Sequence, residues 1–485
     1  MEKTISLQAL REQFSGCGDY NERRIRFGLG SSLSLPVCWL DGASSSSVIG
    51  LEILQPLTDF LRAARTEDPA QALARVEAGG VFRCAFQRRD SLADAAEDLC
   101  RGCCLILWED LGCALSFEVR TEQRRAVSEP SLEKSLKGGK DSFTETLRVN
   151  TALLRQRLAT PKLKIAESTL GQRSRTRLAL LYLEGVAQAE IVEEAARRLD
   201  ALDIDTLLSV GSLEEALVDA PLSPFPQLLH TERPDRFAMH LADGRVGLLI
   251  DGIPVGLLLP ASLSEFMKVT GDSSMHFVVA SALSMLRWLA LIIGAFLPAF
   301  YASVAMYHQE MIPTRLLLSI VEAEQDVPFS TALELLSMLA AFSLLQEAGL
   351  RMPNPIGDTV SIIGALIVGQ AAVEAKVVSP IAIIVVAVSG IACYTLPSQD
   401  LGSAVRLTRL ALLIGAILAG LYGVGLVSCL VLLHLSDLDS FGTNYTAPLS
   451  SGRPGGLGRL LLRWPKLLNK GRDPQLHTPD RRRQA

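Results

Sequence analysis

Polar and charged side chains that could form a functional site are concentrated in one apolar segment late in the chain. Residues 359–373 carry no charge, but Gln370 lies among them, and Glu374 and Lys376 follow at once. Because they are four residues apart, Gln370 and Glu374 share one face of a helix. A carboxylate against lipid is costly and normally faces protein or water. This face is therefore expected to line a water-filled path or a contact between subunits.

A helix over residues 357–378 would have two unlike sides. Small side chains form one side, and such stripes let membrane helices approach closely. The helix-packing candidates are Gly364, Ala365, Ala371 and Ala372. The pore-lining candidates, on the other side, are Ile363, Ile367, Gln370 and Glu374. In a ring of identical chains Glu374 would become a ring of carboxylates, which favours cations.

Other settings for these carboxylates stay open. Glu374 could lie in the lipid headgroup layer, where a short helix ends near Lys376. It could also form a buried ion pair with Lys376, although a spacing of two residues places them on different helical faces. Glu334, an intramembrane polar candidate within the apolar residues 330–346, also has two alternatives. It could face a subunit contact, or its helix could lie flat on the membrane surface with the carboxylate in water.

Other kinds of chemistry find little support. No nucleophile–base pair, phosphate-binding loop or metal-ligand set stands out, so no catalytic residue, metal or cofactor is expected, and the chain is not predicted to be an enzyme. Four cysteines cluster at Cys100, Cys103, Cys104 and Cys113, but their spacing is irregular and no histidine is near. Buried, reduced thiols explain them better than a zinc site does.

The chain that has to position these residues is divided into parts of different hydrophobicity. Hydrophobic residues make up 49% of the 485, and the long apolar runs are concentrated in residues 276–436. Three of these runs are long enough to span a bilayer. They are residues 288–309, 377–399 and 410–436, and the weaker candidates are 330–346 and 359–376.

The residues before these runs predict two α/β subdomains. Residues 36–42 and 103–110 have the pattern of strands, and Asp251-Gly252 between two apolar runs indicates a hairpin. We expect an α/β soluble region of two subdomains, followed by an all-α multi-pass membrane domain and a basic C-terminal tail. The predicted divisions are residues 1–130, a linker at 131–145, residues 146–275, a membrane domain of four to six helical segments at 276–440, and the tail at 441–485.

Charge predicts the orientation. The first residues lack an apolar core of signal-peptide length, so the soluble part is expected in the cytoplasm. Residues 451–485 hold nine Arg or Lys against two Asp, and a basic segment after the last span favours the cytoplasmic side. Two cytoplasmic ends need an even number of crossings, whereas five segments are candidates. One of them, 330–347 or 359–376, is therefore expected to be interfacial or re-entrant.

Several long motifs resemble the A subunits of the GerA family of spore germination proteins. Those of the apolar part are HQEMIPTRLLLSI (308–320), LQEAGLRMPNPIGDTVSIIGALIVGQAAVEAKVVSP (345–380), YTLPSQDLGSAVRLTRL (394–410) and DSFGTNYTAPLS (439–450). The soluble part adds GRVGLLIDGIPVGLLLPAS (244–262). The resemblance covers residues 140–450 well. Met352, Asn354 and Asp358 depart from the usual pattern, which leaves the selectivity of the segment open.

The resemblance implies a multi-pass protein of the spore inner membrane with its soluble domain on the cytoplasmic side. It implies a homo-oligomer that contacts membrane lipid and forms the pore of a nutrient-gated ion channel. Its implied partners are a transporter-like B subunit and a lipoprotein C subunit. No nucleic-acid partner is expected. Alternatives are a scaffold or amplifying channel like the related stage V sporulation protein AF, or a secondary transporter. Transporters usually show repeated halves, and no such repeat is found in this sequence.

Overall fold

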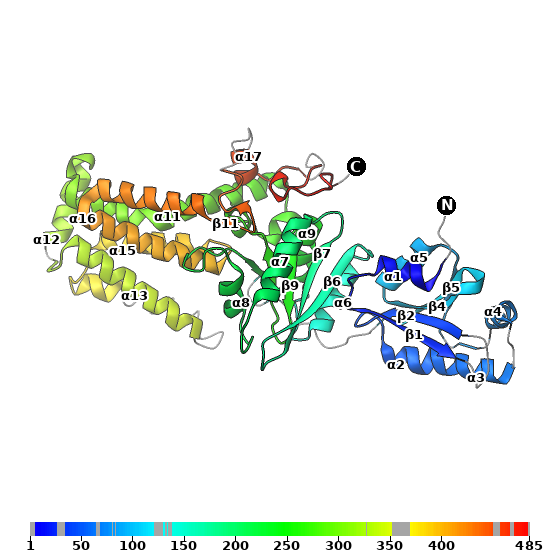
Figure 1. The fold of residues 1–485 in the computed structure, drawn as a ribbon. Coiled ribbons are helices and arrows are strands. Elements are labelled where there is room, and N and C mark those ends of the chain that lie inside the picture. Colours follow the sequence, from blue (N-terminus) through cyan, green and yellow to red (C-terminus); the bar gives the residue numbers. More distant parts are fainter. Residues whose placement is uncertain are drawn as a thin grey trace.

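In the computed structural model the chain forms three consecutive parts that lie in a row (Figure 1). Two α/β parts come first, and a helical part extends from the second of them. The structure describes residues 5–483 except for 27–33, 65–67, 80, 83, 121–129, 131, 132, 134–137, 326, 352–368, 450–455 and 466–469. The predicted fold class, an α/β region of two units followed by an all-α membrane part, is confirmed.

The first part is an antiparallel sheet between two layers of helices. Its strands, in the order β1-β2-β4-β5-β3, are β1 (Tyr20–Arg26), β2 (Ser34–Leu40), β3 (Phe86–Arg89), β4 (Cys103–Trp108) and β5 (Cys113–Glu118). Successive side chains of β4 alternate between the two faces, so Leu105 packs on one helical layer and Ile106 on the other. One layer holds α1 (Leu7–Gln13) and α5 (Leu92–Cys100). The other holds α2 (Ser46–Val48), η1 (Ile49–Leu54), α3 (Gln55–Ala64) and α4 (Pro69–Glu77).

The clustered cysteines belong to the core of this first part. Cys100, Cys103, Cys104 and Cys113 are all buried with free thiols, as the sequence predicted. Burial raises the pKa of the Cys100 thiol to about 12. Protonated thiols of this kind pack as small apolar side chains.

The second part repeats the layered plan with its own sheet. Its strands, in the order β6-β7-β9-β10-β8, are β6 (Leu163–Leu170), β7 (Thr176–Leu183), β8 (Leu229–Thr231), β9 (Val246–Ile250) and β10 (Gly256–Leu259). The helices α6 (Leu147–Arg157) and α9 (Pro234–Ala242) cover one face, and α7 (Ala189–Ala201) and α8 (Val210–Leu217) cover the other. Asp251, in the turn of the predicted hairpin, accepts a hydrogen bond from the first backbone N–H of α6, at 2.8 Å.

A buried ion pair joins the two α/β parts. Arg155 of α6 donates two hydrogen bonds to the carboxylate of Asp19, at 2.9 and 3.0 Å, and both side chains are 1% exposed. Arg155 also donates to the carbonyl of Leu163, at 2.9 Å, and the backbone N–H of Gly18 donates to Ile165. Such a bidentate pair fixes the two parts in one orientation.

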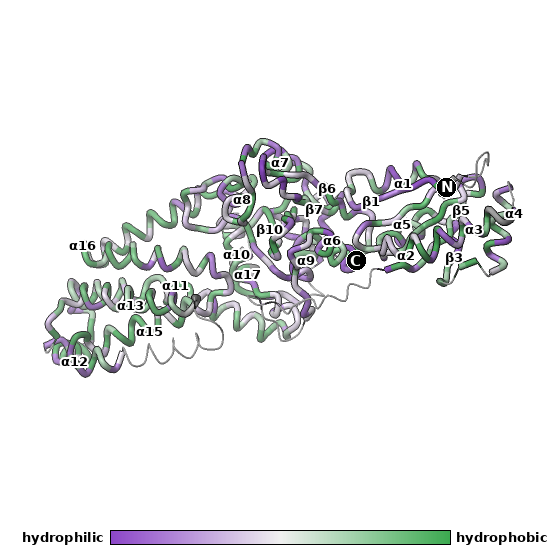
Figure 2. Tube along the Cα trace, turned by 90° about the horizontal axis from the view of Figure 1, so that it is seen from below, coloured by the Kyte–Doolittle hydropathy of each residue, from purple (hydrophilic) through white to green (hydrophobic). Residues whose placement is uncertain are grey.

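The helical part contains the apolar surface of the chain (Figure 2). Its helices are α11 (Phe277–Tyr307), η4 (Gln309–Met311), α12 (Thr314–Gln325), α13 (Thr331–Arg351), α15 (Pro380–Tyr394) and α16 (Gln399–Asp437). In the described part of the chain, three helices are long and apolar enough to cross a membrane, within Phe277–Tyr307, Thr331–Ala348 and Gln399–Asp437. We call the end that carries α12, farthest from the α/β parts in Figure 1, the distal end.

The last apolar run is two helical legs, and not the single span that its length suggested. The backbone leaves helical geometry at Ala419 and at Gly420, whose φ of 59° favours glycine. The first leg begins beside the second α/β part, where Asp400 contacts His230 at 3.0 Å, and the second leg returns to it, where His434 contacts Ser223 at 2.8 Å. A straight helix of 39 residues would be about 58 Å long and could not reach both.

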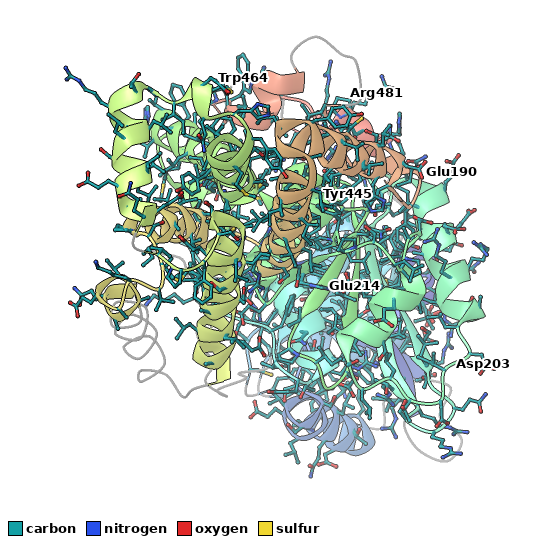
Figure 3. The ribbon with its side chains drawn as sticks, turned by 90° about the vertical axis from the view of Figure 1, so that its left-hand side faces the viewer. Glu190, Asp203, Glu214, Tyr445, Trp464 and Arg481 are labelled. Atoms are coloured by element: carbon teal, nitrogen blue, oxygen red, sulfur yellow. The ribbon has the colours of Figure 1, made fainter. Side chains whose placement is uncertain are left out.

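The chain beyond α16 folds back onto the second α/β part. The short strands β11 (Asp439–Ser440) and β12 (Thr443–Asn444) pair there. Tyr445 is fully buried where α16 meets the second α/β part, against Phe225 and Phe266 (Figure 3). The remaining elements are η2 (Glu109–Leu111), α10 (Leu263–Phe266), η3 (Thr270–Ser274), α17 (Gly456–Leu461) and η5 (Pro474–Leu476).

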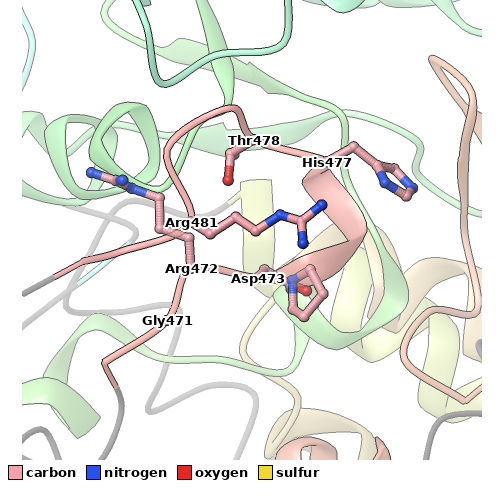
Figure 4. A pocket seen from close by; sticks show the side chains of 7 residues that line it. Gly471, Arg472, Asp473, His477, Thr478 and Arg481 are labelled. Carbon is pink, nitrogen blue, oxygen red and sulfur yellow. The ribbon is translucent and has the colours of Figure 1, made fainter.

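Arginines of the basic tail serve this docking. Arg463 donates hydrogen bonds to the backbone carbonyls of Asp272, Ser273 and Met275. Arg472 donates to the carbonyl of Ala242, at 2.9 Å, and lines a small pocket formed by tail residues alone (Figure 4). These guanidinium groups bind the fold itself, so the sequence count of nine basic residues overstates the charge that is free to attract lipid.

Candidate functional site

The described residues of the predicted pore segment form the end of one helix and the turn after it. Residues 369–374 are helical, and Gln370 and Glu374 are both exposed on the surface of the helical part. They share one side of that helix because they are four residues apart. The other candidates of the segment, Ile363, Gly364, Ala365 and Ile367, lie outside the described residues.

Glu374 lies close to the distal end. The helix stops within two residues, at Lys376, whose φ is 55°. Ser379 then caps α15, accepting a hydrogen bond from the backbone N–H of Ala382 at 3.3 Å. Because Ser379 also contacts the first turn of α13, this turn is at the distal end. An exposed carboxylate at this position does not form a buried ion pair, and it suits the mouth of a path or the headgroup layer better than the middle of a membrane.

The small residues of this helix have different surroundings. Ala372 is half-buried and packs against the hydrophobic core of the helical part, and a methyl group added at Gly369 would lie 4.0 Å from Ile383 of α15. Ala371, next to Ala372, is exposed. The side of the helix that packs within the chain is therefore opposite the side that carries Gln370 and Glu374.

Glu334 occupies neither of the two settings expected from the sequence. Its side chain is 1% exposed, inside the bundle of this single chain. One carboxylate oxygen accepts hydrogen bonds from the backbone N–H and the hydroxyl of Ser379, at 3.1 and 2.9 Å. Both the subunit contact and the flat surface helix are therefore wrong. The reason is that Glu334 caps the start of α15, a partner 45 residues away that no local pattern reveals.

Arg409 is a buried charge that the sequence interpretation missed. It is 3% exposed in the first leg of α16 and donates to the hydroxyl of Ser389, at 3.1 Å. Ser389 in turn donates to the carbonyl of Gly294, at 2.8 Å, so the three residues connect α16, α15 and α11. A span drawn from Leu410 excluded Arg409 because a charge normally ends such a segment. The burial of Arg409 could have been suspected from length, because residues 399–418 alone are long enough to form one helix across a membrane.

Histidines connect the second α/β part to both legs of α16. His230 of β8 lies between Asp400, at 3.0 Å, and Glu214 of α8, at 3.4 Å. Burial disfavours the charged imidazole, but the hydrogen bonds to Asp400 and Glu214 outweigh it and raise the pKa of His230 to about 9. The other connection is the hydrogen bond between Ser223 and His434 of the second leg. A rearrangement of residues 214–231 would therefore act on α16 at both of its ends.

The chain is similar to several proteins that are named spore germination proteins. The model of the Bacillus/Clostridium GerA spore germination protein family matches residues 8–475. Spore germination protein B1 of Bacillus subtilis (strain 168) is 34% identical over 448 residues, which cover 92% of this chain and 91% of that protein. Spore germination protein A1 of the same organism is 36% identical over 352 residues, 73% of each chain.

One solved structure is also similar. It is the crystal structure of the N-terminal domain of the A subunit of the Bacillus megaterium spore germinant receptor GerK3, with 27% identity and a TM-score of 0.42, covering 54% of this chain and 96% of that one. The family match spans nearly the whole sequence and includes the three described helices that are long and apolar enough to cross a membrane. The chain belongs to the Bacillus/Clostridium GerA family of spore germination proteins.

Proposed function

We propose that this chain is the A subunit of a spore germinant receptor and that several copies form a cation-conducting pore in the spore inner membrane. The observation that carries the proposal is the exposure of Gln370 and Glu374 on one side of a helix in an otherwise apolar part of the chain. Lipid is a costly neighbour for both side chains. That cost is avoided if both side chains face a second copy of the chain and a water-filled path shared between the copies.

The position of Glu374 specifies the kind of pore. A ring of these carboxylates would lie close to the distal end and would act as a cation-attracting mouth. The α/β parts and the docked tail lie together at the opposite end of the helices (Figure 1). We place that end in the spore core, because basic segments next to a last span favour the inner side.

Gating would pass through the contacts between the second α/β part and α16. The family resemblance suggests that the trigger is a nutrient held by a transporter-like B subunit, with a lipoprotein C subunit in the same complex. A signal that moves residues 214–231 would reach α16 through His230 and Ser223.

Ion release from germinating spores tests the proposal. Glu374→Gln keeps the shape and removes the charge, so cation release should slow while the receptor still assembles. Gln370→Leu should slow it by dewetting a narrow path. The matched control is Glu322→Gln, which neutralises an exposed carboxylate of α12 and should leave release unchanged. Normal release in both pore variants, with assembly confirmed, would remove this segment from the pore.

A further inference from the structure

A second group of acidic side chains lies inside the distal end of the helical part. Its members come from four helices: Tyr301 of α11, Glu324 of α12, Thr331 and Glu334 of α13, and Ser379 at the start of α15. We propose that this distal cluster binds a hard metal cation, of the alkali or alkaline-earth class. The proposal rests on the cluster alone and not on the pore.

Glu334 supplies a buried oxygen without a protein partner. Its Oε2 accepts both hydrogen bonds from Ser379, whereas its Oε1 is buried and accepts none among the described residues. A buried carboxylate oxygen without a donor is unfavourable by several kcal/mol unless something else compensates the charge.

Tyr301 supplies a second buried oxygen of the same kind. Its hydroxyl is buried and makes no hydrogen bond of good geometry with the described residues. It lies close enough to Glu324, Glu334 and Ser379 to interact with all three electrostatically. Two buried oxygens that make no geometrically good hydrogen bond among the described residues, on different helices, are therefore close enough to interact.

Glu324 adds a second carboxylate. Its Oε1 accepts a hydrogen bond from the hydroxyl of Thr331, at 3.1 Å. Glu324 and Glu334 repel one another electrostatically. In the part of the chain that the structure describes, no Lys, Arg or His forms an ion pair with either carboxylate. Glu324 is only half-buried, so the cluster is exposed to solvent at this residue. A bound cation would neutralise the repulsion where no protein cation does.

The donors specify the class of ion. Carboxylate and hydroxyl oxygens are ligands for Na⁺, K⁺, Ca²⁺ and Mg²⁺, whereas zinc and other transition metals prefer imidazole or thiolate. Among the described residues no group of three or more His, Cys, Asp or Glu could hold a metal ion, so a cation bound by the two carboxylates here would need hydroxyl oxygens as further ligands. The site is therefore expected to discriminate by charge and size among hard cations.

Thermal unfolding of the purified full-length chain in detergent tests the proposal. Tm is measured in NaCl, KCl, CaCl₂ and MgCl₂, each titrated against N-methyl-D-glucamine chloride at equal ionic strength. Binding to the folded state should raise Tm saturably, by about 2–5 °C at a hundredfold excess over Kd, for at least one of these cations. Glu334→Gln and Glu324→Gln should each lose this increment.

Two comparisons keep the result interpretable. Without a binding cation, Glu334→Gln should be at least as stable as the unaltered chain, because it removes a buried repulsion. Glu322→Gln, two residues from Glu324 but exposed, should retain the full increment. A Tm of the unaltered chain that is the same in all salts would overturn the proposal and would mean that the carboxylates are neutralised by protons. An increment that survives in both Glu324→Gln and Glu334→Gln would overturn it too.

Discussion

Replacing Gly423 by alanine should open the two legs of α16. A methyl group at Gly423 would overlap the carbonyl oxygen of Gly415, a backbone atom of the other leg that cannot turn aside as a side chain could. Overpacking of this kind typically costs about 1–3 kcal/mol and occasionally more, and a backbone clash belongs at the upper end of that range. Gly425 lies two residues further along the same leg, and a methyl group there would meet nothing within 4 Å.

The two variants therefore form a matched pair. Gly425→Ala should stabilise the chain slightly, by about 0.5–1 kcal/mol, because alanine is the better helix former. Gly423→Ala should unfold at a clearly lower temperature, measured by tryptophan fluorescence of the full-length protein in detergent. In a straight α16, Gly415 and Gly423 would be about 12 Å apart and the two variants would behave alike. Equal unfolding temperatures would therefore refute the folded-back helix.

Three further predictions concern the contacts between the parts. Asp19→Ala leaves Arg155 buried without its partner and should cost about 3–5 kcal/mol, seen as easier denaturant unfolding of the whole chain, whereas Asp59→Ala in the same part should change little. The folded pKa of His230, about 9, lies above the ordinary value of 6.5, so its contribution to stability is complete below pH 6.5 and is lost as the pH rises through 9. The protection factors of amides in the first turn of α16, which correct hydrogen exchange for its intrinsic pH dependence, should fall across that range in the unaltered chain and stay constant in His230→Gln. Arg463→Ala removes the hydrogen bonds to the carbonyls of η3, and trypsin should then cleave the tail faster; an unchanged rate would show that other contacts hold it.

Much of the α/β region could be predicted because its signals are local. The short apolar runs of β4, β9 and β10 and the Asp251-Gly252 turn between β9 and β10 are signals contained within a few residues. The pairing of Asp19 with Arg155 was not predictable, because 136 residues separate two charges that sequence patterns treat as surface groups.

The helical part was harder to predict, for a physical reason. Apolar composition reports that a segment avoids water, but it does not report where the backbone turns. The run from Leu410 to Ser436 contains no proline, and its break depends on Gly420 and on the contact between Gly415 and Gly423. Glu334 was assigned the wrong surroundings and Arg409 was overlooked. In both cases the partner, Ser379 or Ser389, belongs to another helix. Burial of a charge inside a bundle depends on tertiary contacts alone.

Thiol accessibility shows whether residue 374 faces the water of a cation pathway, as we propose for Glu374. The receptor, assembled with its companion subunits, carries Glu374→Cys in a background in which Cys429, an exposed cysteine of α16, is serine. A charged, water-soluble thiol reagent should react with this cysteine and reduce the cation current. Leu418→Cys, at a position that is 76% exposed but apolar, is the control and should carry unchanged current. An unreactive cysteine at position 374, or a current that persists after its complete labelling, would show that residue 374 does not line the cation pathway.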